Sequence, residues 1–234
     1  MSLRVTGRVP ELWDAVTGNI SSAKKWKFEK GRTLLPLRLE ANASIFIVLQ
    51  QRATKQLSNE GKNWIETKPV AKINTPWTVS FDPKVGGPNK RVIFNELTDW
   101  SKNADSSIRY YSGTAKYINT FNWKQKIPNE KVWLNVGKVS NIAEVIVNGI
   151  NCGIIWTAPY RIDITKAIRK GNNNLTIEVS NTWANRIIGD HRLPEDKRIT
   201  NTNAPYRLEG KPLLEAGLLG PVELEHENFS QGRE

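Results

Sequence analysis

Eight residues in two short segments have the side chains that carbohydrate recognition requires. A sugar site needs a flat aromatic face against the C–H surface of the ring and nearby amide, guanidinium and carboxylate groups for the hydroxyls. Trp156 and Trp183 each follow a predicted apolar strand and lead into a polar loop. If the two strands share a sheet, their trailing loops meet at one end of it. The predicted rim consists of Trp156, Tyr160, Arg161, Asn181, Trp183, Asn185, Arg186 and Asp190.

A structural role explains the same residues, and the sequence favours it slightly. In this alternative Arg186 pairs with Asp190, and the tryptophan rings pack the loops onto the body of the domain. The rim could also contact another domain, which requires a broader apolar patch than a sugar does. Solvent accessibility distinguishes these uses, because a sugar site keeps its tryptophan face and its hydrogen-bonding groups open.

No residue has a sequence context that predicts catalysis. Glycoside hydrolysis uses two carboxyl groups, about 5–5.5 Å apart for retention or about 6.5–9.5 Å apart for inversion. Many carboxylates are present, but most are expected to be solvated or to cap turns. No G-x-S-x-G or phosphate-binding loop occurs. His191 and His226 do not stand at metal-ligand spacing, so no cofactor is predicted. A structural calcium ion held by backbone carbonyl groups is compatible with the sequence.

Alternating apolar residues predict that strands position these side chains. Val132, Leu134 and Val136 alternate with polar or aromatic residues, the period of a half-buried strand. The Asn148-Gly149 pair tolerates positive φ and predicts the turn of a hairpin over Ala143–Trp156. A helical turn is expected at Lys166–Arg169, a loop at residues 181–190 and one closing strand over Leu218–Leu224. The fold class is therefore all-β.

Several motifs resemble known glycoside hydrolases. The run VNGINCGIIWTAPYRIDITKAIRKGNNNLTIEVSN is similar to the sugar-binding jelly-roll module of glycoside hydrolase family 2. NTWANRIIGD, LPED and LLEAGLLGPVELE resemble the C-terminal part of family 106, the α-L-rhamnosidase-like enzymes. The resemblance implies a galactose-binding-like jelly-roll β-sandwich over residues 70–226, preceded by a β-strand segment, residues 4–65, that closes an upstream β-sandwich. In that family the catalytic carboxylates lie in an upstream barrel, and no residue of this chain matches them.

The expected function is therefore non-catalytic and carbohydrate-associated: sugar binding, or support of a catalytic barrel in the same polypeptide. The alternative is a complete small glycosidase that uses its own Asp/Glu pair. Among 234 residues the net charge is +11, but the cations are scattered, which argues against nucleic acid as a partner. No apolar run reaches the roughly 18 residues of a membrane span. Met1-Ser2-Leu3 is typical of a vector start, so a longer parent protein is expected, in the periplasm or outside the cell.

Overall fold

The structure is a computed structural model that describes residues 1–41, 43–124, 131–200, 202 and 210–227. Contacts divide the chain into two compact units, Met1–Thr67 and Lys68–His226. Strands dominate both units, which confirms the predicted all-β class. Within the described ranges, no helix is long and apolar enough to cross a bilayer. That the first unit closes a sandwich begun by a preceding domain stays a prediction.

Two small antiparallel sheets make up the first unit. Leu12 in β2 (Glu11–Trp13) and Trp26 in β4 (Lys25–Glu29) turn inward and meet Ala23 and Leu35 in a small core. The sheets have the orders β1-β5-β4-β7 and β3-β2-β6. Their other strands are β1 (Ser2–Leu3), β3 (Ile20–Ser22), β5 (Arg32–Leu34), β6 (Phe46–Val48) and β7 (Leu57–Asn59).

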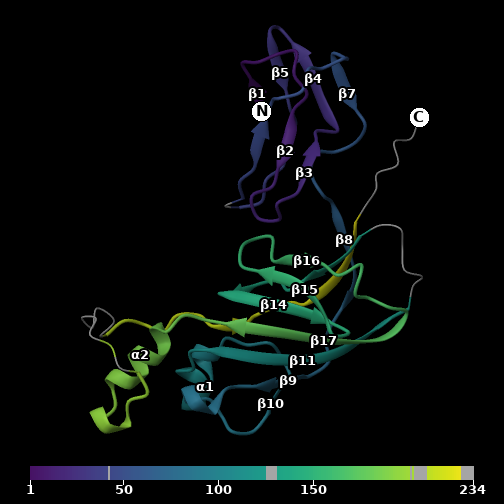
Figure 1. The fold of residues 1–234 in the computed structure, drawn as a ribbon. Coiled ribbons are helices and arrows are strands. Elements are labelled where there is room, and N and C mark those ends of the chain that lie inside the picture. The colour runs from purple at the N-terminus through teal and green to yellow at the C-terminus, as the bar shows by residue number, and fades with distance from the viewer. Residues whose placement is uncertain (42, 125–130, 201, 203–209, 228–234) are drawn as a thin grey trace. The chain divides into compact units, whose positions relative to one another are not determined.

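The larger sheet of the second unit has the order β10-β9-β11-β17-β14-β15 (Figure 1). Its strands are β9 (Trp77–Ser80), β10 (Val92–Phe94), β11 (Thr114–Trp123), β14 (Ile142–Val147), β15 (Ile150–Ile155) and β17 (Gly171–Ser180). Alternation directs Ala143, Val145 and Val147 into the core, where all three are buried. The predicted hairpin is confirmed, since β14 and β15 pair across a turn at Asn148 and Gly149, whose φ angles are 52° and 81°.

A smaller sheet completes the sandwich, with the order β16-β12-β19-β8. Its strands are β8 (Thr67–Lys72), β12 (Val132–Asn135), β16 (Arg161–Asp163) and β19 (Glu223–Glu227), and a separate pair is formed by β13 (Val139–Ser140) and β18 (Gly217–Leu218). The prediction of one closing strand over Leu218–Leu224 is therefore wrong. Gly220, with a φ of 69°, and Pro221, which has no N–H, separate β18 from β19. Strand β19 lies between β12 and β8.

Aromatic side chains fill one part of the core between the sheets. Trp100 begins the short 3-10 helix η2 (Trp100–Lys102), and its indole N–H donates to the Tyr117 hydroxyl at 2.6 Å. The two rings stack with their centroids 6.4 Å apart. Burial raises the pKa of Tyr117 well above its ordinary value, and the hydrogen bonds from the Leu218 and Trp100 N–H groups oppose this only in part. The hydroxyl therefore stays neutral and anchors both donors.

Two α-helices lie at one end of the larger sheet, α1 (Ser106–Arg109) and α2 (Ala184–His191) (Figure 1). The prediction of a loop over residues 181–190 is wrong, because α2 spans most of it. Its polar residues face inward and find partners there, as described below. The helical turn predicted at Lys166–Arg169 lies slightly earlier, as a single turn in which the N–H groups of Ala167 and Ile168 donate to the Ile164 carbonyl. Two further 3-10 helices are η1 (Pro83–Val85) and η3 (Glu195–Lys197).

Candidate functional site

The two predicted rim segments follow β15 and β17, two strands of the larger sheet whose C-terminal ends lie on the same side of the sheet. Strand β14 pairs antiparallel with both β15 and β17, and Ala143 lies opposite Ile155 on one side and Val179 on the other. Strands β15 and β17 therefore run in the same direction on either side of β14. Trp156 and Asn181, which follow shortly after them, leave the sheet at one end.

Trp156 belongs to an exposed apolar group at this edge. Ile155 is buried, so its neighbours Ile154 and Trp156 point to the outer face, where they are 59% and 56% exposed. Ile142 precedes the buried Ala143 and points outward too, with 45% of its surface exposed. We call Ile142, Ile154 and Trp156 the corner patch. The rim prediction missed both isoleucines, although an apolar residue in the outward phase of an alternating strand signals such a patch.

Tyr160 and Arg161 belong to a different part of the domain. Tyr160 is partly buried against the core, and its carbonyl accepts a hydrogen bond from the Val136 N–H. Arg161 lies in β16 of the smaller sheet, opposite Asn135. Its guanidinium carbon is 5.4 Å from the centroid of the Trp133 ring, within the range of a cation–π contact.

The two amides of the rim bond to the backbone. Asn181 accepts from the Gly113 N–H and donates to the Tyr111 carbonyl, both at 2.9 Å. Asn185 accepts from the N–H of Leu214 and donates to its carbonyl, both at 2.7 Å. Each amide therefore fastens one chain segment to another.

Arg186 and Asp190 form a buried ion pair on α2. Arg186 Nη1 lies 3.5 Å from Asp190 Oδ1, and Asp190 is only 1% exposed. Asp190 Oδ2 accepts from the N–H groups of Ile199 and Thr200, at 3.0 and 2.7 Å, and from the Thr200 hydroxyl at 2.7 Å. Arg186 lies against Gly86, where an added Cβ would come within 2.9 Å of Nη2. The pair thus ties α2 to two loops.

Trp183 stands immediately before α2, and its ring is half exposed at 50%. It retains an open face, but the neighbouring polar groups that a sugar would need, on Asn181, Asn185, Arg186 and Asp190, are engaged inside the protein. Only the two tryptophans of the predicted rim are thus highly exposed. Replacing Trp183 should therefore cost far less stability than replacing a buried tryptophan.

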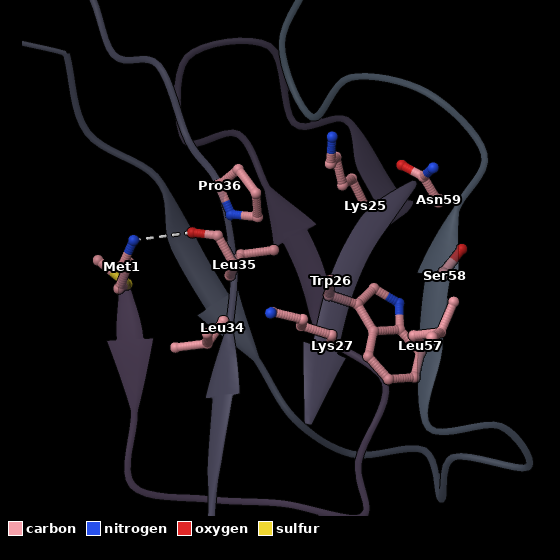
Figure 2. A pocket seen from close by; sticks show the side chains of 10 residues that line it. All are labelled: Met1, Lys25, Trp26, Lys27, Leu34, Leu35, Pro36, Leu57, Ser58 and Asn59. Atoms are coloured by element: carbon pink, nitrogen blue, oxygen red, sulfur yellow. Dashed lines mark hydrogen bonds between the residues drawn. The ribbon is translucent and has the colours of Figure 1, made fainter. Parts of the chain in front are cut away.

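A groove of about 600 Å³ lies in the first unit (Figure 2). Its lining residues are not among the predicted functional residues. Trp26 is almost fully buried and presents little surface, while the Met1 amino group donates to the Leu35 carbonyl. The groove lacks the convergent, fixed polar groups that orient a small ligand. It is lined by Met1, Lys25, Trp26, Lys27, Leu34, Leu35, Pro36, Leu57, Ser58 and Asn59.

Metal and nucleophilic chemistry find little support in the described part of the chain. No group of three or more His, Cys, Asp or Glu side chains there could hold a metal ion. The ring of His226 packs on Trp123, with the centroids 5.2 Å apart. Burial raises the pKa of the Cys152 thiol, which lowers its reactivity as a nucleophile.

The second unit has the fold of a galactose-binding-like β-sandwich domain. Residues 95–209 match the family described as the glycosyl hydrolase 2 galactose-binding domain-like family. That segment includes α1, most of the larger sheet and α2.

Two longer proteins resemble the chain. A rhamnosidase from Novosphingobium sp. PP1Y has a TM-score of 0.86 and 36% identity, and the match covers 97% of this chain and 21% of that one. A protein of Formosa agariphila, provisionally named a beta-glucuronidase, is 38% identical over 173 residues, which are 63% of this chain and 15% of that protein. The chain thus spans about a fifth or less of either relative. Membership of family 106 stays a prediction.

Proposed function

We propose that the unit Lys68–His226 is a non-catalytic module of a longer glycoside hydrolase, and that its corner patch packs against another domain of the same polypeptide. The observation that carries this proposal is the exposure of Ile142, Ile154 and Trp156 side by side on one face. Contiguous apolar side chains on a surface mark sites of contact with other proteins or domains. Both relatives are much longer than this chain. Their length supports a partner domain within the same polypeptide. The periplasmic or extracellular location stays a prediction.

The polar groups of the predicted rim favour packing over sugar binding. A sugar needs hydrogen-bonding groups that are free to pair with its hydroxyls. Asn181, Asn185 and Asp190 have their partners within the domain. Domain packing needs no such groups and gains free energy from each apolar side chain that it removes from water.

The double variant Ile154→Thr/Trp156→Ser separates packing from folding. In the isolated chain we expect a change of no more than about 0.5 kcal/mol in unfolding free energy, because both side chains are exposed. In the full-length gene product we expect the unfolding temperature of this domain to fall by several degrees, since buried contacts are lost. Scanning calorimetry measures both.

The matched control is Ile93→Thr, which removes an exposed isoleucine from β10 at the opposite edge of the same sheet. This control should change the unfolding of neither the isolated chain nor the full-length product. Equal shifts of the double variant in the isolated chain and in the full-length product would contradict the proposal. A gene that encodes only these 234 residues would also end it.

Sugar binding through Trp183 is the second candidate, because its half-exposed ring offers an apolar face. Titration of the chain with neutral oligosaccharides, followed by tryptophan fluorescence, tests this candidate. A saturable change that Trp183→Ala abolishes and Trp156→Ala retains would support it.

The isolated chain is expected not to hydrolyse aryl α-L-rhamnosides or β-galactosides. The proposed role needs no acid/base pair, and Asp190, the one carboxylate of the rim, is held by Arg186 and Thr200. Release of the aryl group, followed by absorbance, checks this. Turnover that disappears when one Asp or Glu of this chain is replaced would favour the alternative of a complete small glycosidase.

A further inference from the structure

Two arginines, one at the end of α1 and one directly after α2, lie against one tyrosine ring. Arg109 is the last residue of α1, and Arg192 follows α2 directly. Their guanidinium carbons are 5.1 and 5.8 Å from the centroid of the Tyr110 ring. Arg192 Nη1 also donates to the Tyr110 hydroxyl at 3.0 Å. We call Arg109, Tyr110 and Arg192 the arginine cluster.

The charge of this cluster is not balanced by neighbouring acids. Neither Arg109 nor Arg192 forms an ion pair with a carboxylate in the described ranges. Asp105, one turn before Arg109, caps α1 by accepting from the N–H and hydroxyl of Ser107. Asp190, two residues before Arg192, is committed to Arg186 and Thr200. The helix C-termini contribute only a fractional negative charge. Among the residues that the structure describes, the cluster therefore keeps a net positive charge.

The tyrosine between the arginines is held in place from behind. Gly189 of α2 packs on Tyr110 so closely that an added Cβ would lie 2.7 Å from its Cγ atom. Arg109 donates one long hydrogen bond, 3.5 Å to the Asn103 carbonyl, and its Nε is buried without a partner among the described residues. Each guanidinium carries five N–H donors, and apart from the buried Arg109 Nε, those that the described residues do not engage are available to a ligand.

We propose that the arginine cluster binds the acid group of an anionic saccharide, a carboxylate or a sulfate ester. Guanidinium groups form paired, charge-assisted hydrogen bonds with planar or tetrahedral oxyanions. All three residues lie within the segment that matches the galactose-binding-like family. A saccharide is therefore favoured over an acidic peptide. This inference rests on the proposed association with a glycoside hydrolase, but it does not depend on the corner patch.

Titration calorimetry of the chain with a galacturonic acid hexasaccharide and with its methyl ester tests the proposal. The ester keeps the sugar skeleton and removes the charge. We expect the acid to bind at least about tenfold more tightly than the ester, because charge-assisted hydrogen bonds contribute that much. Binding of the acid should weaken as salt is added. A sulfated hexasaccharide in the same assay distinguishes the two kinds of acid group.

Arg192→Gln should lower the affinity for the acid about tenfold and leave binding of the ester unchanged. Arg192→Lys keeps the positive charge but loses the paired N–H donors of the guanidinium, so its affinity for the acid should lie between those of the wild type and Arg192→Gln. Lys170→Gln removes an exposed charge elsewhere on the domain and serves as the matched control. Thermal unfolding of each variant shows that it is folded.

Each contrary result overturns the proposal in a distinct way. Equal affinity for acid and ester would leave a sugar-binding domain without an acid site. Equal losses of affinity in Arg192→Gln and Lys170→Gln would show that only the overall charge of the domain attracts the acid. Tighter binding of polyglutamate than of the saccharide would identify an acidic protein segment as the ligand. Binding of none of these probes would remove the site altogether, with the packing function untouched.

Discussion

Replacing Asp190 by alanine is expected to lower the unfolding free energy of the second unit by about 3–5 kcal/mol. The change leaves the Arg186 guanidinium buried without its partner and removes the acceptor for the N–H groups of Ile199 and Thr200. Alanine favours helix, so the loss does not come from helix propensity. Urea denaturation followed by tryptophan fluorescence measures the change.

The double variant Asp190→Ala/Arg186→Met is the control. Replacing both members of a buried ion pair by apolar side chains is often nearly neutral, because no charge is left without a partner. We therefore expect the double variant to be more stable than Asp190→Ala, although the lost contacts to Thr200 keep it below the wild type. A double variant that loses as much as the sum of the two single variants would show that the charges do not interact.

Trp100→Ala is expected to cost about 3–5 kcal/mol or more, because the fully buried ring leaves a large cavity. The ring contacts Tyr117 and also Phe81 and Tyr111, whose centroids lie 5.3 and 5.6 Å away. A loss of this size is a large part of the 5–15 kcal/mol that typically stabilises a domain. Calorimetry of the unfolding transition provides the measurement.

Tyr117→Phe separates the hydrogen bond from the packing. It keeps the stacked ring but removes the oxygen that accepts from the N–H groups of Trp100 and Leu218. We expect a loss of about 1–3 kcal/mol, the cost of leaving buried donors without a partner. A cost for Trp100→Ala no larger than this would indicate that the cavity collapses around the missing ring.

Local sequence patterns predicted the larger sheet well. In β14 the alternation of Ala143, Val145 and Val147 sets which side faces the core, and the Asn148-Gly149 pair fixes the turn. These features depend on neighbouring residues, so they can be recognised in a single sequence.

The helix α2 could not be recognised in this way. Its inward face carries Asn185, Arg186 and Asp190; Arg186 and Asp190 pair with each other across one turn, but Leu214 and Gly86, which bond to Asn185 and Arg186, are distant in sequence. A polar inward face removes the apolar period by which an amphipathic helix is recognised. The candidate rim separated for the same reason: the types of its residues suit sugar recognition, but only the fold decides which partners they meet.

The place of β19 between β12 and β8 has a consequence for synthesis on the ribosome. Strand β8 is one of the first segments of the second unit to be translated, whereas β19, which lies next to it in the smaller sheet, is the last. Until residues Glu223–Glu227 emerge, β8 and β12 have no strand between them, and their inward residues, including Val132 and Leu134, lack part of their cover. The nascent domain therefore completes its sandwich only when translation has passed its final strand.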